Sequence, residues 1–68
     1  MTNEFQQLSN LARRALEVTD WDTVSSCANE LIHRDPHSAE GYFLLGRVEK
    51  ARKRPVKARE AFEQAVHM

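Results

Sequence analysis

The sequence predicts an all-α protein made of four short helices. Apolar residues recur at the three- and four-residue intervals of a helix in four separate segments, and each segment follows a residue suited to start a helix. The 68 residues include 41% hydrophobic and 29% charged side chains with two glycines and two prolines, which is typical of a globular helical chain. A chain of this length forms one domain at most.

The first two helices are expected over residues 4–18 and over about 21–34. Asn3 precedes a glutamine by three residues, the spacing of a capping box, and Asp20 can accept a hydrogen bond at the start of the second helix. Pro36 stops the second helix, because proline disfavours a helical conformation in the residue before it. The expected apolar stripes are Phe5, Leu8, Leu11, Ala12, Ala15 and Val18 in the first helix and Trp21, Val24, Ala28, Leu31 and Ile32 in the second.

A third helix is expected after Ser38, which can cap it, and should end in the polar stretch 52–54. Pro55 marks the start of the fourth helix, because a proline in the first helical turn lacks only an N–H that would have had no partner. The result is four short helices joined by tight turns. The apolar positions are Tyr42, Leu45 and Gly46 in the third helix, with Phe43 as a further candidate, and Ala58, Ala61, Phe62, Ala65 and Val66 in the fourth.

The apolar positions of the two helix pairs match at a constant offset of 34 residues. Only three aligned positions are identical, so the repeat rests on the size and polarity of the residues. Small residues such as Ala12 and Gly46 are expected to let the helices of each pair approach closely. The chain is therefore predicted to be one domain, 1–68, with repeats at about 4–36 and 38–68. The matching pairs are Leu8 with Tyr42, Leu11 with Leu45, Ala12 with Gly46, Val24 with Ala58, Ala28 with Phe62, and Leu31 with Ala65.

Six residues of the second pair resemble the signature of the tetratricopeptide repeat family, which has an aromatic residue, Leu-Gly, Ala, Phe and Ala at these intervals. They are Tyr42, Leu45, Gly46, Ala58, Phe62 and Ala65. Pro36 stands where the preceding repeat would close, and the first pair keeps only the apolar character of the pattern. Glu49 departs from it, because the family usually has an aromatic residue there. The resemblance covers nearly the whole chain as two repeats.

This resemblance implies an all-α fold of two stacked antiparallel helix-turn-helix repeats in a right-handed superhelical array. In the family, the first helix of each pair lines a concave groove that binds extended peptides or partner helices. The expected function is therefore that of a protein–protein interaction module, with no enzymatic activity and no cofactor. Such modules often begin larger proteins, so the resemblance also leaves open that the chain is an N-terminal fragment of one.

The residues expected to bind a peptide lie at matching positions of the first and third helices. The spacing i, i+4, i+7 places three residues of each helix on one side, roughly away from the apolar stripe. Arg13 and Arg47 would present guanidinium groups, which form paired hydrogen bonds with carboxylates, so an acidic peptide is the expected ligand. Solvated arginines with no binding role are the alternative. The predicted set is Ser9, Arg13, Leu16, Phe43, Arg47 and Lys50.

The chain has no net charge, but its charges are unevenly distributed. Residues 1–40 contain seven acids and three bases, whereas residues 41–68 contain seven bases and three acids. The bases within 47–59 leave nucleic-acid binding open as an alternative function. We disfavour it, because this stretch has no aromatic residue that could stack on bases.

The outer side of the last helix suggests a third alternative. Phe62, Ala65 and Val66 would meet water unless something covers them. Two copies could pair through this face, with the acidic end of one copy against the basic end of the other. A homodimer and a self-associating assembly module are therefore also candidates.

Other sites are not expected. Cys27 falls beside the apolar stripe of the second helix, where a buried free thiol acting as a small hydrophobic residue is the ordinary outcome. His33 and His37 have Pro36 between them and no paired cysteines beside them, so we expect no metal site. The single cysteine and the absence of a secretory signal or an apolar membrane-spanning stretch predict a cytoplasmic protein.

Overall fold

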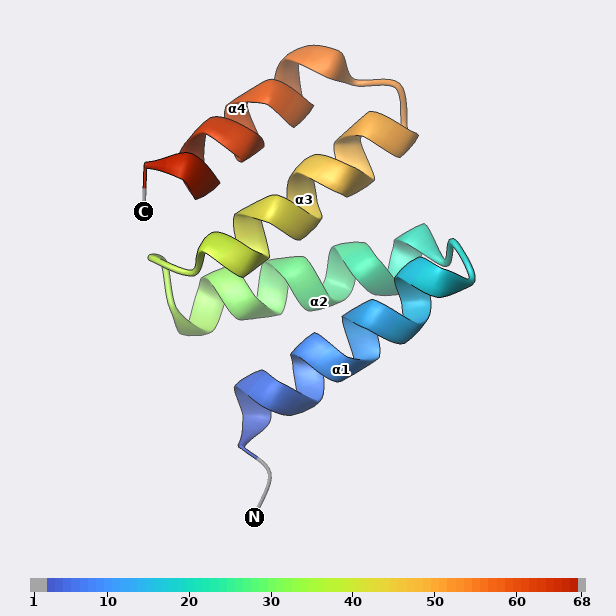
Figure 1. Ribbon diagram of the computed structural model, residues 1–68, viewed down its shortest axis with the longest axis vertical. Helices are drawn as coiled ribbons and strands as arrows, with labels where there is room; N and C mark the ends of the chain where they lie inside the picture. Colours follow the sequence, from blue (N-terminus) through green and yellow to red (C-terminus); the bar gives the residue numbers. More distant parts are fainter. Residues whose placement is uncertain (1–2, 68) are drawn as a thin grey trace.

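Four helices and no strand are present in residues 3–67, the part of the chain that the computed structural model describes (Figure 1). They are α1 (Glu4–Glu17), α2 (Trp21–Arg34), α3 (Ala39–Ala51) and α4 (Pro55–Val66). The predicted all-helical chain with four helices is confirmed, and the predicted starts of the helices agree. Within this range, every helix is too short or too polar to cross a membrane.

Side chains at the helix starts explain where α1, α3 and α4 begin. The Asn3 Oδ1 accepts a hydrogen bond from the backbone N–H of Gln6 at 2.7 Å, and the Ser38 Oγ accepts one from the N–H of Gly41 at 3.1 Å. In α4, Pro55 occupies the first turn, where its missing N–H leaves no donor unpaired. These residues satisfy or remove the free N–H groups of a helix N-terminus.

Asp20 caps α2 with both of its carboxylate oxygens. Its Oδ2 accepts a hydrogen bond from the Thr23 hydroxyl at 2.6 Å, and its Oδ1 accepts one from the Thr23 backbone N–H at 3.3 Å. These bonds lower the pKa of Asp20 below its ordinary value, the side-chain bond more than the backbone one. The ionised carboxylate therefore adds negative charge at the positive end of the helix dipole.

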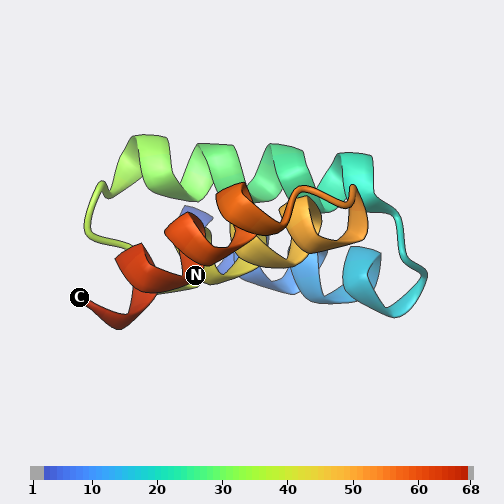
Figure 2. The ribbon, with the colours of Figure 1, turned by 90° about the horizontal axis from the view of Figure 1, so that it is seen from above.

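Successive helices run in opposite directions, and each packs on the next helix in the sequence (Figure 1). α1 and α4 lie at opposite ends of the longest axis of a molecule that measures 38 × 27 × 15 Å. Viewed along that axis, α1 and α3 lie on one side and α2 on the other (Figure 2). α2 therefore packs against α1 and α3 from the same side.

The core is formed by the first three helices. Its largest fully buried side chains are Leu31, Val24 and Val48. Trp21 is half-buried and packs against this core from the start of α2, in agreement with its predicted place on the apolar stripe of the second helix. The buried cluster consists of Ala12, Ala15, Val24, Cys27, Ala28, Leu31, Leu44 and Val48.

α3 is apolar over a wider arc than predicted. The sequence places its apolar face on Tyr42, Leu45 and Gly46, but the structure also buries Leu44 and Val48, at 4% and 0% exposure. α3 needs this wider arc because it packs on α2 with one side and on α4 with the other. A helix with two neighbours has to cover two apolar surfaces at once.

In α1, by contrast, the buried face is narrower than predicted. Ala12 and Ala15 are buried. Phe5, Leu11 and Val18 are 37%, 47% and 71% exposed, so their predicted place in the core is wrong. The main packing partner of α1 is α2, and one helical neighbour covers only a narrow strip.

The turns within the two helix pairs have the same backbone geometry. Thr19 and Lys53, which are 34 positions apart, have φ angles of 53° and 61°. In each turn the next residue donates its N–H to the carbonyl five residues earlier, at 2.8 Å in the first turn and 2.9 Å in the second. A left-handed residue followed by this bond is a common way to close a helix C-terminus.

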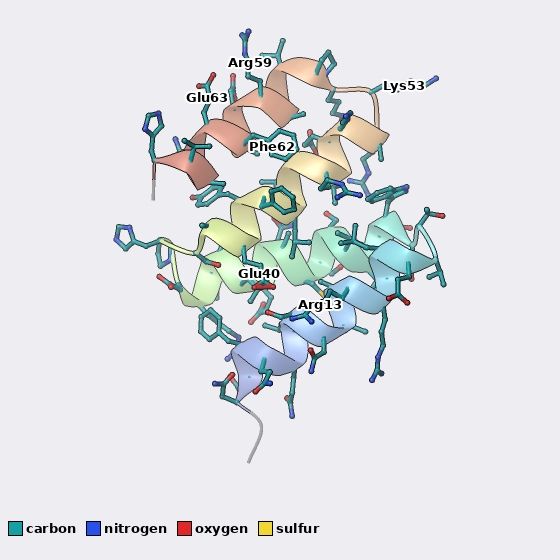
Figure 3. All side chains as sticks on the ribbon, viewed as in Figure 1. Arg13, Glu40, Lys53, Arg59, Phe62 and Glu63 are labelled. Carbon is teal, nitrogen blue, oxygen red and sulfur yellow. The ribbon has the colours of Figure 1, made fainter. Side chains whose placement is uncertain are left out.

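A glycine allows α3 and α4 to lie close together. A Cβ atom added at Gly46 would lie 2.5 Å from Cε1 and 2.6 Å from Cδ1 of the Phe62 ring. Phe62 lies between the two helices (Figure 3). The ring therefore occupies the space that a side chain at position 46 would need, and the predicted spacing role of Gly46 is confirmed.

We expect Gly46→Ala to lower the free energy of unfolding by about 1–3 kcal/mol, because the added methyl group overlaps the Phe62 ring. The sign is diagnostic, since the same replacement at an open helical position raises stability by about 1 kcal/mol. Urea denaturation followed by circular dichroism measures the change. The double variant Gly46→Ala/Phe62→Leu should recover part of the loss. Strictly additive losses would show that the contact is not the cause.

We expect Lys53→Gly to raise the free energy of unfolding by about 1 kcal/mol, because glycine adopts a left-handed conformation without the steric cost of a Cβ atom. The Lys53 side chain projects away from the turn, so little packing is lost (Figure 3). Asn10→Gly, at an exposed helical position of α1, is the control and should lower stability by about 0.3 kcal/mol. The same urea titrations apply, and a loss at both positions would contradict the prediction.

Candidate functional site

The structure places the six predicted peptide-binding residues in two different environments. Ser9 is buried, with 9% of its surface exposed, and Leu16 is half-buried and packs against the core. Both lie on the same side of α1 as buried Ala12, which is three residues from one and four from the other. The prediction that Ser9 and Leu16 point away from the core is therefore wrong.

The other four predicted residues are exposed. Arg13 lies on α1, and Phe43, Arg47 and Lys50 follow one another along α3 at intervals of four and three residues. Phe43 is 48% exposed. Phe43 and Lys50 each border a hollow between α3 and α4. α3 therefore brings half of the predicted set together on one surface.

Two hollows lie along the seam between α3 and α4. One has a volume of about 530 Å³ and is lined by Ala39, Glu40, Phe43, Phe62, Ala65 and Val66. The other has a volume of about 480 Å³, and its lining includes Lys50, Pro55, Ala58, Arg59 and Glu63. The two share Phe62 and Val66. We call them together the α3–α4 groove.

An aromatic pair contributes the largest apolar surface of the α3–α4 groove. The ring centroids of Phe43 and Phe62 lie 5.8 Å apart, with 56° between the ring planes. This tilted arrangement is among those that aromatic rings favour. Phe62 is half-buried, and Val66, one helical turn later, is 81% exposed. A continuous apolar surface therefore runs from α3 onto α4.

Charged side chains border the α3–α4 groove. Lys50 and Arg59 border one hollow, and Glu40 borders the other. Arg59 and Glu63 project from the outer edge of α4 (Figure 3), with 3.9 Å between the Arg59 Nε and the Glu63 Oε1. An exposed ion pair of this length contributes little to stability, so both groups are available to a ligand.

The sequence identifies Phe43 and Lys50 as exposed residues of the third helix, but it does not place them beside α4. The sequence marks Phe62, Ala65 and Val66 only as a surface that needs a cover. The sequence pattern that could have indicated a binding surface there is the apolar stripe of α4, which is wider than packing on α3 requires. Joining that stripe to Phe43 requires the tertiary structure, because the two phenylalanines come from different helices.

The basic stretch between α3 and α4 is partly neutralised by ion pairs. The Arg52 Nη2 lies 3.0 Å from the Asp22 Oδ1, and the Arg54 Nη1 lies 3.6 Å from the Glu49 Oε2. Lys53 projects from the turn (Figure 3). These contacts tie the stretch to α2 and α3 and reduce the positive charge that it can offer to phosphate groups.

Glu49 is a buried acid of α3. It is 7% exposed, and its Oε2 forms no hydrogen bond with any residue in the described range 3–67. The Arg54 guanidinium supplies a counter-charge from the start of α4. A buried carboxylate that lacks hydrogen bonds depends on its counter-ion, so this pair supports the α3–α4 turn.

Cys27 is buried as predicted, at 2% exposure, and burial raises the pKa of its thiol. It belongs to the core cluster and packs as a small apolar side chain. In the described part of the chain, no three His, Cys, Asp or Glu residues gather in a way that could hold a metal ion.

No family model, curated protein or solved structure matches this chain.

We expect Arg54→Ala to lower the free energy of unfolding by about 1–3 kcal/mol, because it leaves the Glu49 carboxylate buried without its counter-charge. Glu49→Gln should cost less, since it removes the buried charge itself. In the double variant the loss should be smaller than the sum of the single losses, which a double-mutant cycle in urea measures. Additive losses would mean that the two side chains do not interact.

Proposed function

We propose that the protein is a protein–protein interaction module that binds a segment of another protein in the α3–α4 groove. The observation that supports this most directly is the pair of exposed Phe43 and half-buried Phe62 beside two apolar hollows. Single exposed apolar residues are ordinary, but a contiguous apolar surface beside hollows is typical of a binding site.

The composition of the α3–α4 groove suits a protein ligand. Its centre is apolar and its border carries Lys50, Arg59 and Glu63, the distribution found in protein interfaces. Full burial of a phenylalanine or valine side chain stabilises a complex by about 1.5–3 kcal/mol. The exposed fractions of Phe43 and Val66 therefore supply a useful part of the affinity that a peptide requires.

The ligand is expected to carry acidic side chains. Arg47 lies between Phe43 and Lys50 on the exposed side of α3, and Arg13 is exposed on α1. Arginine binds carboxylates through two parallel hydrogen bonds, and such contacts are frequent among residues that dominate binding. An acidic residue next to the side chain that fills the groove would meet Arg47 and Lys50, which lie three residues apart on α3.

The two helix pairs are proposed to be tetratricopeptide-like repeats. In support, Thr19 and Lys53 place a left-handed residue at matching positions of both turns. α1 and α3 also lie on the same side of the molecule (Figure 2). In such an arrangement the first helix of each pair faces the ligand, which agrees with the exposure of Arg13 and Phe43.

Selecting a displayed library of random peptides on the full chain tests this function. Enriched peptides should shift the amide resonances of Phe43, Arg47 and Phe62 in an NMR titration. Val66→Gln should weaken their binding by about tenfold, equivalent to about 1.4 kcal/mol, because it removes an exposed apolar side chain from the groove. Val56→Gln is the matched control, since Val56 is 57% exposed on the same helix and borders neither hollow.

Amide shifts confined to α2 would contradict the proposed site, as would equal losses of affinity for the Val56 and Val66 variants. The acidic character of the ligand has a separate test. Arg47→Ala should weaken binding of an acidic peptide about threefold to tenfold and flatten the dependence of its affinity on salt. An unchanged salt dependence would show that Arg47 does not contact the ligand.

A further inference from the structure

We propose that the α3–α4 groove binds an amphipathic helix of another polypeptide, docked as α3 itself docks on α1 and α2. The proposal rests on the proposed protein-binding function and specifies its ligand. It follows from a comparison of the two seams, which are the lines of contact between the helices of each pair. The first seam, between α1 and α2, is closed by α3, and the second, between α3 and α4, is open.

α3 packs on α2 and closes the core that α1 and α2 share. A Cβ atom added at Gly41 of α3 would lie 2.8 Å from the Ile32 Cγ1 and 3.4 Å from the carbonyl oxygen of Ala28, so α2 and α3 nearly touch there. Leu44 and Val48, three and seven residues after Gly41, belong to the core cluster. α3 therefore docks through one small and two apolar residues on one face.

The seam between α3 and α4 has matching residues 34 positions later, but they are exposed. Ser9 and Ala28 are 9% and 0% exposed in the first seam. Their counterparts in the second seam are Phe43, which is 48% exposed, and Phe62, which is half-buried. The second seam is thus both more apolar and more open at these two places.

The ends of α2 and α4 show the same difference. Ile32 is half-buried and touches the α3 backbone at Gly41, whereas its counterpart Val66 is 81% exposed. Leu31 is 1% exposed, whereas its counterpart Ala65 is half-buried. Ile32 and Leu31 therefore contact or lie beside α3, whereas their counterparts Val66 and Ala65 have none of the described helices over them.

The larger aromatic residue of the second seam does not block a docked helix. Phe62 stands where the first seam has Ala28, and Gly46 stands where it has Ala12. The Phe62 ring takes up the space that Gly46 leaves between α3 and α4. The hollows on either side of the ring remain open.

The docking face of the bound helix follows from that of α3. A small residue should face Val66, and apolar residues should follow three and seven positions later. Acidic residues beside this stripe should face Lys50 and Arg59, because the first seam has the uncharged Leu16 and Ser25 at these places. The helix should run in the direction opposite to α4, as α3 runs opposite to α2 (Figure 1).

A second copy of this chain does not offer that face. In α3 the docking face is buried in the core of its own molecule. The residues of α1 that correspond to it are exposed and polar: Gln7, Asn10 and Arg14. Burying them in an apolar groove would leave hydrogen-bonding groups unpaired. A helix from a different polypeptide therefore fits the groove better.

The apolar docking face is tested with a synthetic peptide that copies residues 35–53, which include α3 and its cap, added to the full chain. This segment has four bases and three acids, so it tests the apolar face alone and not the acidic border. Because an isolated helix of this length is marginal in water, the same segment is also joined after residue 68, which raises its effective concentration to about millimolar. In both forms the amides of Gly46, Phe62 and Val66 should shift. The joined chain should also gain helical circular dichroism and unfold at a higher urea concentration.

Two matched controls separate helix docking from unspecific contact. The first is the same segment with Leu44→Ser and Val48→Ser, which keeps the length and the cap but loses the apolar face. It should bind at least about tenfold more weakly than the unchanged segment. The second is the chain itself, in which Val66→Gln should weaken binding of the unchanged segment and Val56→Gln should not.

The proposal is overturned if the joined segment stays unfolded and leaves the Phe62 amide unshifted. If library peptides without helical structure bind the groove while the helical segment does not, the protein-binding function stands and the helical ligand is wrong. If neither shifts the groove, both are wrong. Concentration-dependent dimerisation of the unmodified chain in sedimentation, with shifts at Val66, would make a second copy the occupant and also overturn the proposal.

Discussion

α3 has to satisfy two helix interfaces at once, and the arrangement of the whole chain depends on it. Its 13 residues bury Leu44 and Val48 in the core shared with α1 and α2, and leave space at Gly46 for the Phe62 ring of α4. A domain of this size has little other core to compensate for a poor fit on either side. The outer helices have one main neighbour each, so their free sides decide what the molecule can bind.

The positions of the helices could be predicted because their start signals are local. Asn3, Asp20 and Ser38 each accept the expected hydrogen bond from a residue three positions later. Burial could not be predicted in the same way. Leu11 is 47% exposed although it lies on the predicted stripe, and Leu44 is buried although it does not. The width of the buried face of an amphipathic helix depends on how many helices pack against it. The spacing of apolar residues within one helix does not give that number.

The α3 side of the candidate site follows from helical spacing, and the α4 side does not. Phe43 and Lys50 lie on the exposed side of α3 as predicted. The same spacing misplaces Ser9 and Leu16, because the arc from i to i+7 on α1 reaches the side that the core covers. Phe62 becomes part of the α3–α4 groove through its contact with Phe43, which is a property of the tertiary structure.

Unlimited head-to-tail growth is disfavoured by three polar residues of α1, which stand where α3 has its apolar docking face. A molecule with an apolar groove at one end and a complementary apolar ridge at the other could add copies without limit and form fibres. Gln7, Asn10 and Arg14 occupy the place of such a ridge, and their desolvation opposes that contact. A foreign helix seated in the groove would therefore give a complex of fixed stoichiometry and not a fibre.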